Sequence, residues 1–365
     1  MTELNPDISP LVDGLSSDPK TWSNTSLISV TQITSSGLDL LFHKALEMRT
    51  LVQRGGGGND KQKHKILSNV FYEASTRTSC SFQTAMMRLG GTFIHVDASS
   101  GGNTSASKKG ETLSDTIKCL QCYTDVTVLR HSIKGTLGDL VMNGGLVKPV
   151  INAGDGVGEH PTQALLDLFT IVDELNMIQG GEEEGENTSA PKKDDTKPLI
   201  VVLLGDLKNG RTVHSLAKLL ARSQQKFLKR KLILRYCSPS SLKMPQYVKD
   251  YVNEYAQRTD CDIEQEEFDG NSIEAAVENA NVLYVTRVQR ERFGSMEEYN
   301  QVKGAYVVNS AFMDQAPSDM IVMHPLPRVD EISIEVDSDP RAAYFRQMEN
   351  GLFVRMAILD LILSQ

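Results

Sequence analysis

Short apolar runs alternate with longer segments in which apolar residues recur at helical spacing, and the alternation starts near residue 65. In the first half of the chain, the apolar runs predict strands at 66–72, 92–97, 125–130 and 149–152. The segments between them predict helices at 79–89, 111–121 and 162–175. Strands that alternate with helices in this way form parallel sheets covered by helices on both faces.

A second series of the same kind occupies the rest of the chain. Its strands are predicted at 199–205, 231–237, 263–268, 282–286, 305–309 and 320–323. Its helices are predicted at 212–222, 245–257 and 272–279, followed by a last helix at 345–363. Two series predict an α/β fold with two doubly wound parallel-sheet domains, and the last helix should pack back onto one of them.

Two polar segments interrupt this pattern. Residues 55–58 are four consecutive glycines, which favour a flexible surface loop. Residues 180–197 carry six acidic residues and three lysines but no large apolar side chain, so we expect a disordered insertion near the domain border. We expect a first domain at 25–160 that is completed by the helical segment 342–365, and a second domain at 161–341.

Composition narrows the class of protein further. The length of 365 residues suits two domains, and 40% hydrophobic with 23% charged residues is ordinary for a globular protein. The net charge of −9 disfavours nucleic acid as a partner, although a local cluster of arginines could still bind a small anion. The apolar runs are too short to cross a bilayer, and residues 1–25 resemble neither a secretory signal nor a transit peptide. We therefore expect a cytoplasmic protein with no membrane contact.

The five cysteines do not form a recognisable metal or disulfide pattern. Cys119 and Cys122 make a C-x2-C pair, but a zinc site would need a second pair or nearby histidines. We expect both to be buried thiols, and we expect no metal site.

The residues Ser75, Thr76, Arg77 and Thr78 lie between a predicted strand and an amphipathic helix. The N-terminus of a helix presents free backbone N–H groups and a partial positive charge, both of which favour phosphate. Hydroxyls add donors, and an arginine can grip a phosphate with two parallel hydrogen bonds. Simple N-capping by serine or threonine explains the same four residues equally well.

Seven blocks of the chain resemble the aspartate and ornithine carbamoyltransferases. They are FYEASTRTS at 71–79, NTSASKKGET at 103–112, LRH at 129–131, HPTQALLD at 160–167, GDLKNGRTVHSL at 205–216, TRVQRER at 286–292 and HPLPR at 324–328. The last three resemble the aspartate-specific branch, and Pro325 stands where the ornithine enzymes carry a cysteine. The resemblance implies transfer of a carbamoyl group from carbamoyl phosphate to L-aspartate in pyrimidine biosynthesis, without a cofactor.

The resemblance also implies roles for residues of the first domain, which becomes the carbamoyl-phosphate-binding domain. Attack on the carbonyl group creates an oxyanion, which needs donors aimed at it. The implied oxyanion donors are Thr78, Arg130 and His160. The implied carbamoyl-phosphate contacts are Ser75, Thr76, Arg77, Thr78, Arg130, His160 and Gln163. Glu73 and Glu111 are expected to hold arginine and lysine side chains in position.

In the second domain, which becomes the aspartate-binding domain, the implied substrate contacts are Arg211, Arg287 and Gln289. Arginine suits a dicarboxylate because its planar fork makes paired hydrogen bonds. Arginines at helix starts and strand ends are usually surface ion-pairing residues, so each alone would be weak support. The implied backbone contacts come from Leu326 and Pro327, whose carbonyls should face the carbamoyl group and the aspartate amine.

Ser105 and Lys109 lie in a polar, glycine- and serine-rich segment, which composition alone would assign to a solvated loop. The resemblance implies that both reach the active site of a neighbouring subunit, where Lys109 takes part in catalysis and aspartate binding. A homotrimer with shared sites follows from this assignment. The sequence leaves open whether a nucleotide such as UMP inhibits the protein.

Three other functions compete with this interpretation. A carbamoyltransferase for another amine, such as ornithine, is disfavoured by the two late blocks at 286–292 and 324–328. A catalytically silent homologue in a pyrimidine-pathway assembly is disfavoured because every expected catalytic residue is present. A dinucleotide-binding dehydrogenase is disfavoured because the glycines at 154, 156 and 158 are followed by Glu159 and do not fit the G-x-G-x-x-G pattern.

Overall fold

The computed structural model describes residues 14–99, 109–178 and 197–364. The chain divides into two compact units. Unit 1 consists of Met1–Phe169 and Glu349–Gln365, and unit 2 consists of Thr170–Met348. Each unit contains its own parallel sheet, as the two series of strands in the sequence predict.

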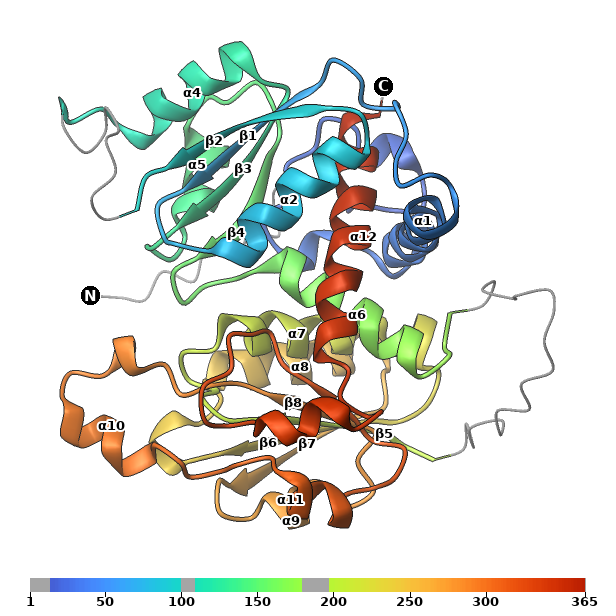
Figure 1. Ribbon diagram of the computed structural model, residues 1–365, viewed down its shortest axis with the longest axis vertical. Helices are drawn as coiled ribbons and strands as arrows, with labels where there is room; N and C mark the ends of the chain where they lie inside the picture. Colours follow the sequence, from blue (N-terminus) through green and yellow to red (C-terminus); the bar gives the residue numbers. More distant parts are fainter. Residues whose placement is uncertain (1–13, 100–108, 179–196, 365) are drawn as a thin grey trace. The chain divides into compact units, whose positions relative to one another are not determined.

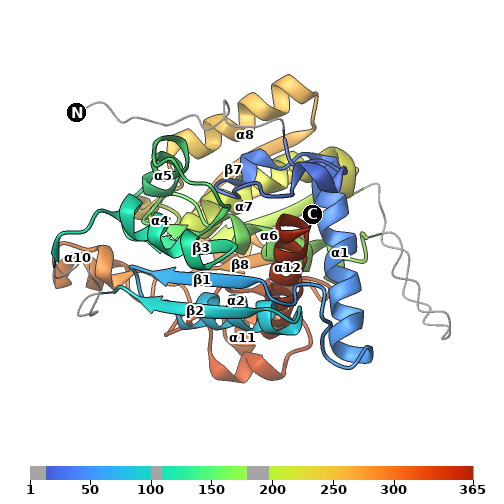
Figure 2. The same cartoon turned by 90° about the horizontal axis from the view of Figure 1, so that it is seen from above.

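Unit 1 is built on a four-stranded sheet with the order β2-β1-β3-β4. Its strands are β1 (Ile66–Phe71), β2 (Thr92–Asp97), β3 (Val126–His131) and β4 (Val150–Asp155). Its helices are α1 (Ser35–Arg54), α2 (Thr76–Arg88), α4 (Leu113–Tyr123) and α5 (Thr136–Asn143). Figures 1 and 2 show α2 on one face of this sheet and α4 and α5 on the other. This placement follows from right-handed crossovers. The connection from β1 to β2 runs towards one edge of the sheet, whereas the connections to β3 and then β4 run towards the other edge, so their helices lie on opposite faces.

Unit 2 is built on a five-stranded sheet with the order β7-β6-β5-β8-β9. Its strands are β5 (Leu199–Leu204), β6 (Leu232–Ser238), β7 (Ile263–Asp269), β8 (Val282–Val285) and β9 (Ile321–Met323). Its helices are α7 (Arg211–Ser223), α8 (Gln246–Thr259), α9 (Ile273–Ala276), α10 (Met296–Val302) and α11 (Ser310–Gln315). Helices α7 and α8 cover one face of the sheet, and α9 and α11 cover the other (Figure 1).

Two helices belong to both units. Helix α6 (Pro161–Glu174) begins in unit 1 and ends in unit 2, whereas α12 (Tyr344–Leu363) begins in unit 2 and ends in unit 1. The C-terminal segment therefore does pack back onto the first unit. It does so through buried side chains such as that of Ile362, and through a hydrogen bond from the backbone N–H of Asn24 to the carbonyl of Ile362.

One predicted strand is wrong. Residues 305–309 do not form a strand, and Val308 makes only an isolated bridge to Ile332. In the described residues β9 is an edge strand with an isolated bridge from Val322 to Ala342, and the segment 305–309 pairs with Ile332 and not with that edge. Tyr306 and Val308 alternate with an exposed Val307 because they enter the core of unit 2, and this burial produces the strand-like pattern.

Helix α1 was not predicted from the sequence, although the signals for it are present. Thr34 caps its N-terminus by accepting a hydrogen bond from the backbone N–H of Gly37. Its buried positions, Leu38, Leu41, Phe42, Ala45 and Met48, recur at helical spacing. Helix α5 was also missed, because eight residues give too short a window for a periodic signal.

Three further expectations, on the cysteines, the insertion and membrane contact, can be set beside the structure. The expectation of buried thiols at Cys119 and Cys122 is wrong, since both side chains are exposed on α4. The buried residues of this helix are Ile117 and Gln121, and the two cysteines lie outside that buried face. The predicted insertion at 180–197 lies, apart from its last residue, outside the described residues. Within the described part of the chain, no helix is long and apolar enough to cross a membrane.

Candidate active site

The four residues predicted to bind phosphate lie where β1 is followed by α2. Ser75 occupies the N-cap position of α2 and Thr76 is its first residue. The Ser75 side chain makes no capping hydrogen bond, so the role of a simple N-cap does not account for its hydroxyl. The first backbone N–H groups of any helix lack partners within it, so this end of α2 is suited to an anion. Arg77 is exposed, whereas Thr78 is buried.

Arg130 is near the end of β3, directly beside β1. Its backbone is in register with Phe71, and the residue as a whole is only 8% exposed. One guanidinium nitrogen donates to the Glu73 carboxylate over 2.5 Å, and another donates to the carbonyl of Ala153 over 3.4 Å. These contacts fix the guanidinium within the unit. The structure thus shows the expected contact between Glu73 and an arginine.

His160 and Gln163 lie where the chain passes from β4 into α6. His160 immediately precedes Pro161, the first residue of the helix, and both polar side chains are buried. The Gln163 amide donates to the carboxylate of Asp167, one turn further along the helix, over 2.9 Å. Asp167 is fully buried. Burial lowers the pKa of the nearby Arg355 guanidinium, and the negative charge of Asp167 opposes this fall without cancelling it. The side chain of Gln163, which is predicted to contact the carbamoyl group, is therefore held in place by the buried Asp167 carboxylate.

The predicted phosphate and carbonyl contacts of unit 1 all follow the carboxyl ends of three neighbouring strands. The segment 75–78 follows β1, Arg130 lies at the end of β3, and His160 follows β4. Because the strands are parallel, these ends meet at one edge of the sheet, which is where ligands bind in open α/β sheets. The fold thus gathers residues that are up to 88 positions apart in the sequence at one edge.

Of the two residues predicted to serve a neighbouring subunit, Ser105 lies outside the described residues and Lys109 is exposed. Glu111, expected to hold a basic side chain, accepts a hydrogen bond from the Thr116 hydroxyl over 2.8 Å.

In unit 2, Arg211 is the first residue of α7 and follows β5. The loop before it is organised by Asp206, which is fully buried. The Asp206 carboxylate accepts hydrogen bonds from the backbone and side-chain nitrogens of Asn209, and from the backbone N–H of Gln289 over 3.4 Å. Burial raises the pKa of Asp206, and the hydrogen bonds oppose that rise. This one carboxylate therefore joins the loop of Arg211 to the segment that carries Arg287 and Gln289.

Arg287 follows the end of β8 and forms a two-pronged ion pair with Glu291. One guanidinium nitrogen donates to a Glu291 oxygen over 3.0 Å, and a second contacts the other oxygen. The hydrogen bonds to Glu291 raise the pKa of Arg287, while burial opposes the rise. The arginine is thus held charged and with its planar fork oriented.

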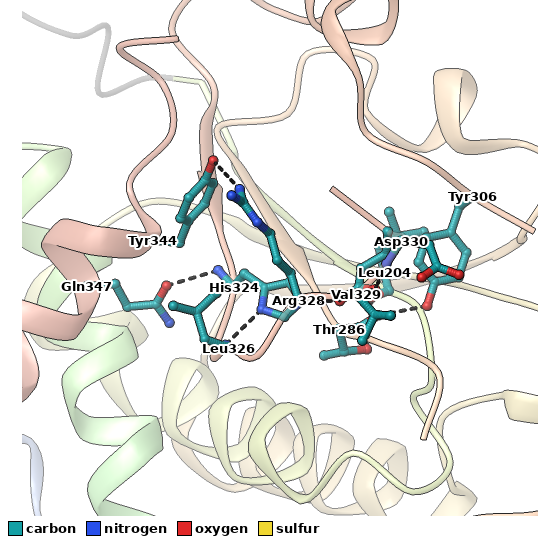
Figure 3. A network of polar contacts seen from close by, with 11 residues as sticks. Leu204, Thr286, Tyr306, His324, Leu326, Arg328, Val329, Asp330, Tyr344 and Gln347 are labelled. Atoms are coloured by element: carbon teal, nitrogen blue, oxygen red, sulfur yellow. Dashed lines mark hydrogen bonds and ion pairs between the residues drawn. The ribbon is translucent and has the colours of Figure 1, made fainter. Parts of the chain in front are cut away.

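Leu326 and Pro327 follow the end of β9 in a turn with an unusual backbone. The Leu326–Pro327 peptide bond is cis, and Leu326 has a φ of 53°, in the left-handed region. The backbone N–H of Leu326 donates to Nδ1 of His324 over 2.8 Å, and the backbone N–H of His324 donates to the Gln347 side chain over 2.9 Å (Figure 3). The turn is therefore fastened on both sides of the predicted contact residues.

The predicted aspartate contacts again follow three neighbouring parallel strands. Arg211 follows β5, Arg287 and Gln289 follow β8, and Leu326 follows β9. Their positions at the carboxyl edge match the general placement of ligand sites in such sheets. The groups that orient the predicted contacts were not singled out in the sequence, namely Asp167 in unit 1 and Asp206, Glu291 and His324 in unit 2. In the described ranges, no cluster of three or more His, Cys, Asp or Glu side chains is arranged to hold a metal ion.

Comparison with known families agrees with this arrangement. Residues 25–173 match the carbamoyl-P binding domain of the aspartate/ornithine carbamoyltransferases, and residues 197–362 match their Asp/Orn binding domain. This chain belongs to the aspartate/ornithine carbamoyltransferase family. The aspartate carbamoyltransferase catalytic subunit of Thermoplasma volcanium is 38% identical over 93% of this chain and 99% of its own length.

Solved structures of the family have the same fold. Aspartate transcarbamoylase from Trypanosoma cruzi, in complex with N-(phosphonacetyl)-L-aspartic acid, is 36% identical with a TM-score of 0.80, over 94% of this chain and 97% of that one. A multifunctional protein of Dictyostelium discoideum is 49% identical over 92% of this chain. The chain spans only 13% of that protein and 13% of the multifunctional protein CAD of Squalus acanthias, another family relative.

Proposed function

We propose that this chain transfers the carbamoyl group of carbamoyl phosphate to the amine of L-aspartate, giving N-carbamoyl-L-aspartate and phosphate. The observation that carries the proposal is that the carboxyl edge of each sheet, one in each unit, gathers side chains suited to one of the two substrates. The edge in unit 1 presents hydroxyls, a helix N-terminus and Arg130, which suit a phosphate. The edge in unit 2 presents Arg211 and Arg287, which suit a dicarboxylate.

In unit 1, the phosphate of carbamoyl phosphate lies against Ser75, Thr76 and Arg77, with Arg130 beside it. The carbonyl oxygen accepts hydrogen bonds from Thr78, Arg130 and His160, which stabilise the negative charge that develops on it. The carbamoyl amide contacts Gln163. The rigid contacts of Arg130 to Glu73 and Ala153 support this, because preorganised donors need no rearrangement as the charge appears.

In unit 2, Arg211 and Arg287 bind the aspartate carboxylates, and Gln289 orients the substrate. The backbone carbonyls of Leu326 and Pro327 accept hydrogen bonds from the aspartate amine and from the carbamoyl NH2 group. We further propose that the two units are the carbamoyl-phosphate and aspartate domains and that carbamoyl phosphate binds first. Holding the amine nitrogen in line with the carbonyl carbon supplies at most about 7–11 kcal/mol.

The chemical step balances without a redox change. The deprotonated amine nitrogen attacks the carbonyl carbon, a tetrahedral oxyanion forms, and the bond from carbon to the phosphate oxygen breaks. The proton released by the nitrogen passes to the departing phosphate, whose oxygen is close to it in the intermediate. This step requires donors and positioning from the protein and no covalent intermediate with it.

The test is an assay of the purified chain with carbamoyl phosphate and either L-aspartate or L-ornithine. We expect carbamoyl-aspartate and stoichiometric phosphate with aspartate, and no product with ornithine. Titration of UMP in the same assay shows whether a nucleotide inhibits. Product formed from ornithine at the higher kcat/KM would overturn the choice of aspartate, and no product from either amine would overturn the transferase.

We also propose that the chain acts as a homotrimer in which Ser105 and Lys109 complete the site of a neighbouring subunit. Support comes from the family pattern of the block at 103–112 and from the exposure of Lys109, which leaves its ammonium group available to another chain. Light scattering gives the mass of the assembly.

A mixing experiment tests the shared site directly. Arg130→Ala and Lys109→Ala chains are each expected to be nearly inactive, because each lacks one half of the site. Random reassembly of equal amounts would restore about a quarter of wild-type activity, since one site in four then has both intact halves. Activity that stays at the level of the separate variants, in a mixture shown to exchange subunits, would rule out the shared site.

A further inference from the structure

Leu326 holds a backbone conformation that a leucine does not adopt unaided. Its φ of 53° places it in the left-handed region, which disfavours side chains with a Cβ atom. Such residues persist only when their surroundings over-determine them, and they gather at functional sites. Leu326 is also one of the two residues whose carbonyls we propose to face the substrates. The contacts that keep it in this state therefore bear on catalysis.

The main such contact comes from His324, two residues earlier, which is almost fully buried. The backbone N–H of Leu326 donates to Nδ1 of His324 over 2.8 Å, so Nδ1 must carry a lone pair. The proton then resides on Nε2, which donates to the Glu331 carboxylate over 2.7 Å. The partners on both sides assign the neutral imidazole with its proton on Nε2.

Glu331 in turn fixes the imidazole ring and the far end of the turn. Its carboxylate accepts from the backbone N–H of Val329 over 3.2 Å and from that of Asp330 over 3.1 Å. The same residue pairs with an earlier core segment, since its backbone carbonyl accepts from the backbone N–H of Val308 over 2.9 Å. Glu331 thus holds the imidazole and residues 329–330 through its carboxylate, and the core segment through its backbone.

The backbone of His324 anchors the turn on its other side. Its N–H donates to the Gln347 side chain on α12, as Figure 3 shows. The imidazole is thereby held at three points: its own backbone, the Glu331 carboxylate and the Leu326 N–H. A ring that is fixed in this way also fixes the orientation of the Leu326 N–H that donates to it, and therefore the orientation of the neighbouring peptide groups of the turn.

We propose that His324 and Glu331 are positioning residues that keep Leu326 in its left-handed conformation, so that the carbonyls of the turn face the carbamoyl group and the aspartate amine. This inference rests on the proposed function. Neither side chain touches substrate in this scheme, and His324 takes no part in proton transfer. Their effect passes through the hydrogen bond from the Leu326 N–H to Nδ1.

Two substitutions of His324 separate the two ring nitrogens. Asparagine places its side-chain oxygen close to the position of Nδ1, so His324→Asn keeps the acceptor for the Leu326 N–H. Glutamine places its side-chain nitrogen close to the position of Nε2, so His324→Gln keeps the donor to Glu331 but loses the acceptor. Tyr236→Phe is the matched control, because it removes a partly buried hydrogen bond from the buried Tyr236 to Gln265 elsewhere in the same unit.

Steady-state kinetics and thermal unfolding of the wild type and these three variants test the proposal. We expect H324Q to raise the KM for aspartate and lower kcat, reducing kcat/KM by about thirtyfold, the scale of one lost buried hydrogen bond. H324N should stay within about fivefold of the wild type. Inorganic phosphate should bind all variants equally, because its contacts lie in unit 1. Y236F should lower the melting temperature without changing the KM.

The outcomes are distinct. Equal kcat/KM values in H324N and H324Q, or a KM for aspartate that is unchanged in H324Q, would overturn the positioning role. If H324Q does not fold, Glu331→Gln takes its place, since it weakens the hold on the ring while keeping an oxygen to accept from Nε2. An unchanged KM in E331Q would equally overturn the proposal. A wild-type protein without carbamoyl transfer would overturn the proposed function, and with it this inference.

Discussion

The guanidinium of Arg130 and the carboxylate of Glu73 form an ion pair over 2.5 Å beside the N-terminus of α2. The Arg130 side chain is 10% exposed and that of Glu73 is 28% exposed, so the pair is only partly open to solvent. Glu73 follows β1 and Arg130 is the last residue but one of β3, and the two strands are hydrogen-bonded neighbours. The arginine is thus placed before any anion arrives, by a residue two positions upstream of the predicted phosphate segment.

Replacing Glu73 tests how much this placement matters. In Glu73→Gln, the charge-assisted hydrogen bond is lost and the guanidinium gains rotamer freedom. We expect kcat to fall by about tenfold, which corresponds to ~1.4 kcal/mol, while the affinity for phosphate does not weaken because a competing negative charge is gone. Steady-state kinetics and phosphate titration measure both. Glu254→Gln, on the exposed side of α8, is the control, and an unchanged kcat in E73Q would contradict the role.

The ion pair between Arg287 and Glu291 should control the affinity for aspartate. Glu291 is 54% exposed and contacts both outer nitrogens of the arginine. Glu291→Gln keeps the shape but removes the charge that orients the fork, so we expect the KM for aspartate to rise about tenfold with kcat nearly unchanged. Glu297→Gln on α10 is the control of equal charge change. Arg287→Ala should raise the KM further, and a wild-type KM there would reject the assignment of Arg287.

The buried group behind Gln163 should matter for stability more than for chemistry. Asp167 is fully buried close to Arg355, whose guanidinium donates to the Ser81 hydroxyl over 2.7 Å. Removing one charge of such a buried pair leaves the other uncompensated, at about 3–5 kcal/mol. We expect Asp167→Asn to lower the free energy of unfolding by this amount, measured by urea denaturation.

A double-mutant cycle separates this pair from other effects. Arg355→Met combined with Asp167→Asn should be less destabilising than the sum of the two single changes, because the second removes the charge that the first left unpaired. Gln163→Ala should instead weaken carbamoyl phosphate binding with little loss of stability. Additive free energies in the cycle would show that the two buried charges do not interact.

Glu331 gives unit 2 an acid-sensitive contact. Burial acts to raise its pKa, but the hydrogen bonds from His324 and from backbone N–H groups outweigh burial and hold the pKa below its ordinary 4.5. A carboxyl group with a lowered folded-state pKa stabilises the protein above pH 4.5, and this contribution is lost as the pH falls through the folded-state value. The difference in unfolding free energy between wild type and Glu331→Gln should therefore be constant near neutral pH and shrink below 4.5. Urea denaturation at several pH values measures it, and a difference independent of pH would contradict the assignment.

The sequence predicted the fold class because buried parallel strands have strong, short apolar runs, as in β5. It failed at 305–309, where burial of alternate side chains imitates a strand, since periodicity does not report whether a neighbouring strand has a free edge. The family motifs marked the residues expected to touch substrate. The groups that orient them, such as Glu291 and Asp167, could not be found this way, because their roles depend on contacts that form only in the folded chain.

The assignment of Glu349–Gln365 to unit 1 has a consequence for biosynthesis. When the ribosome has translated the first half of the chain, unit 1 still lacks the helix that supplies Phe353, Arg355 and Ile358 to its interior. Apolar surface of unit 1 therefore stays uncovered while the whole of unit 2 is synthesised, and unit 2 can fold during this time. We therefore infer that the second unit to be synthesised is the first able to complete its folding, and that the nascent first unit depends most on chaperones during this delay.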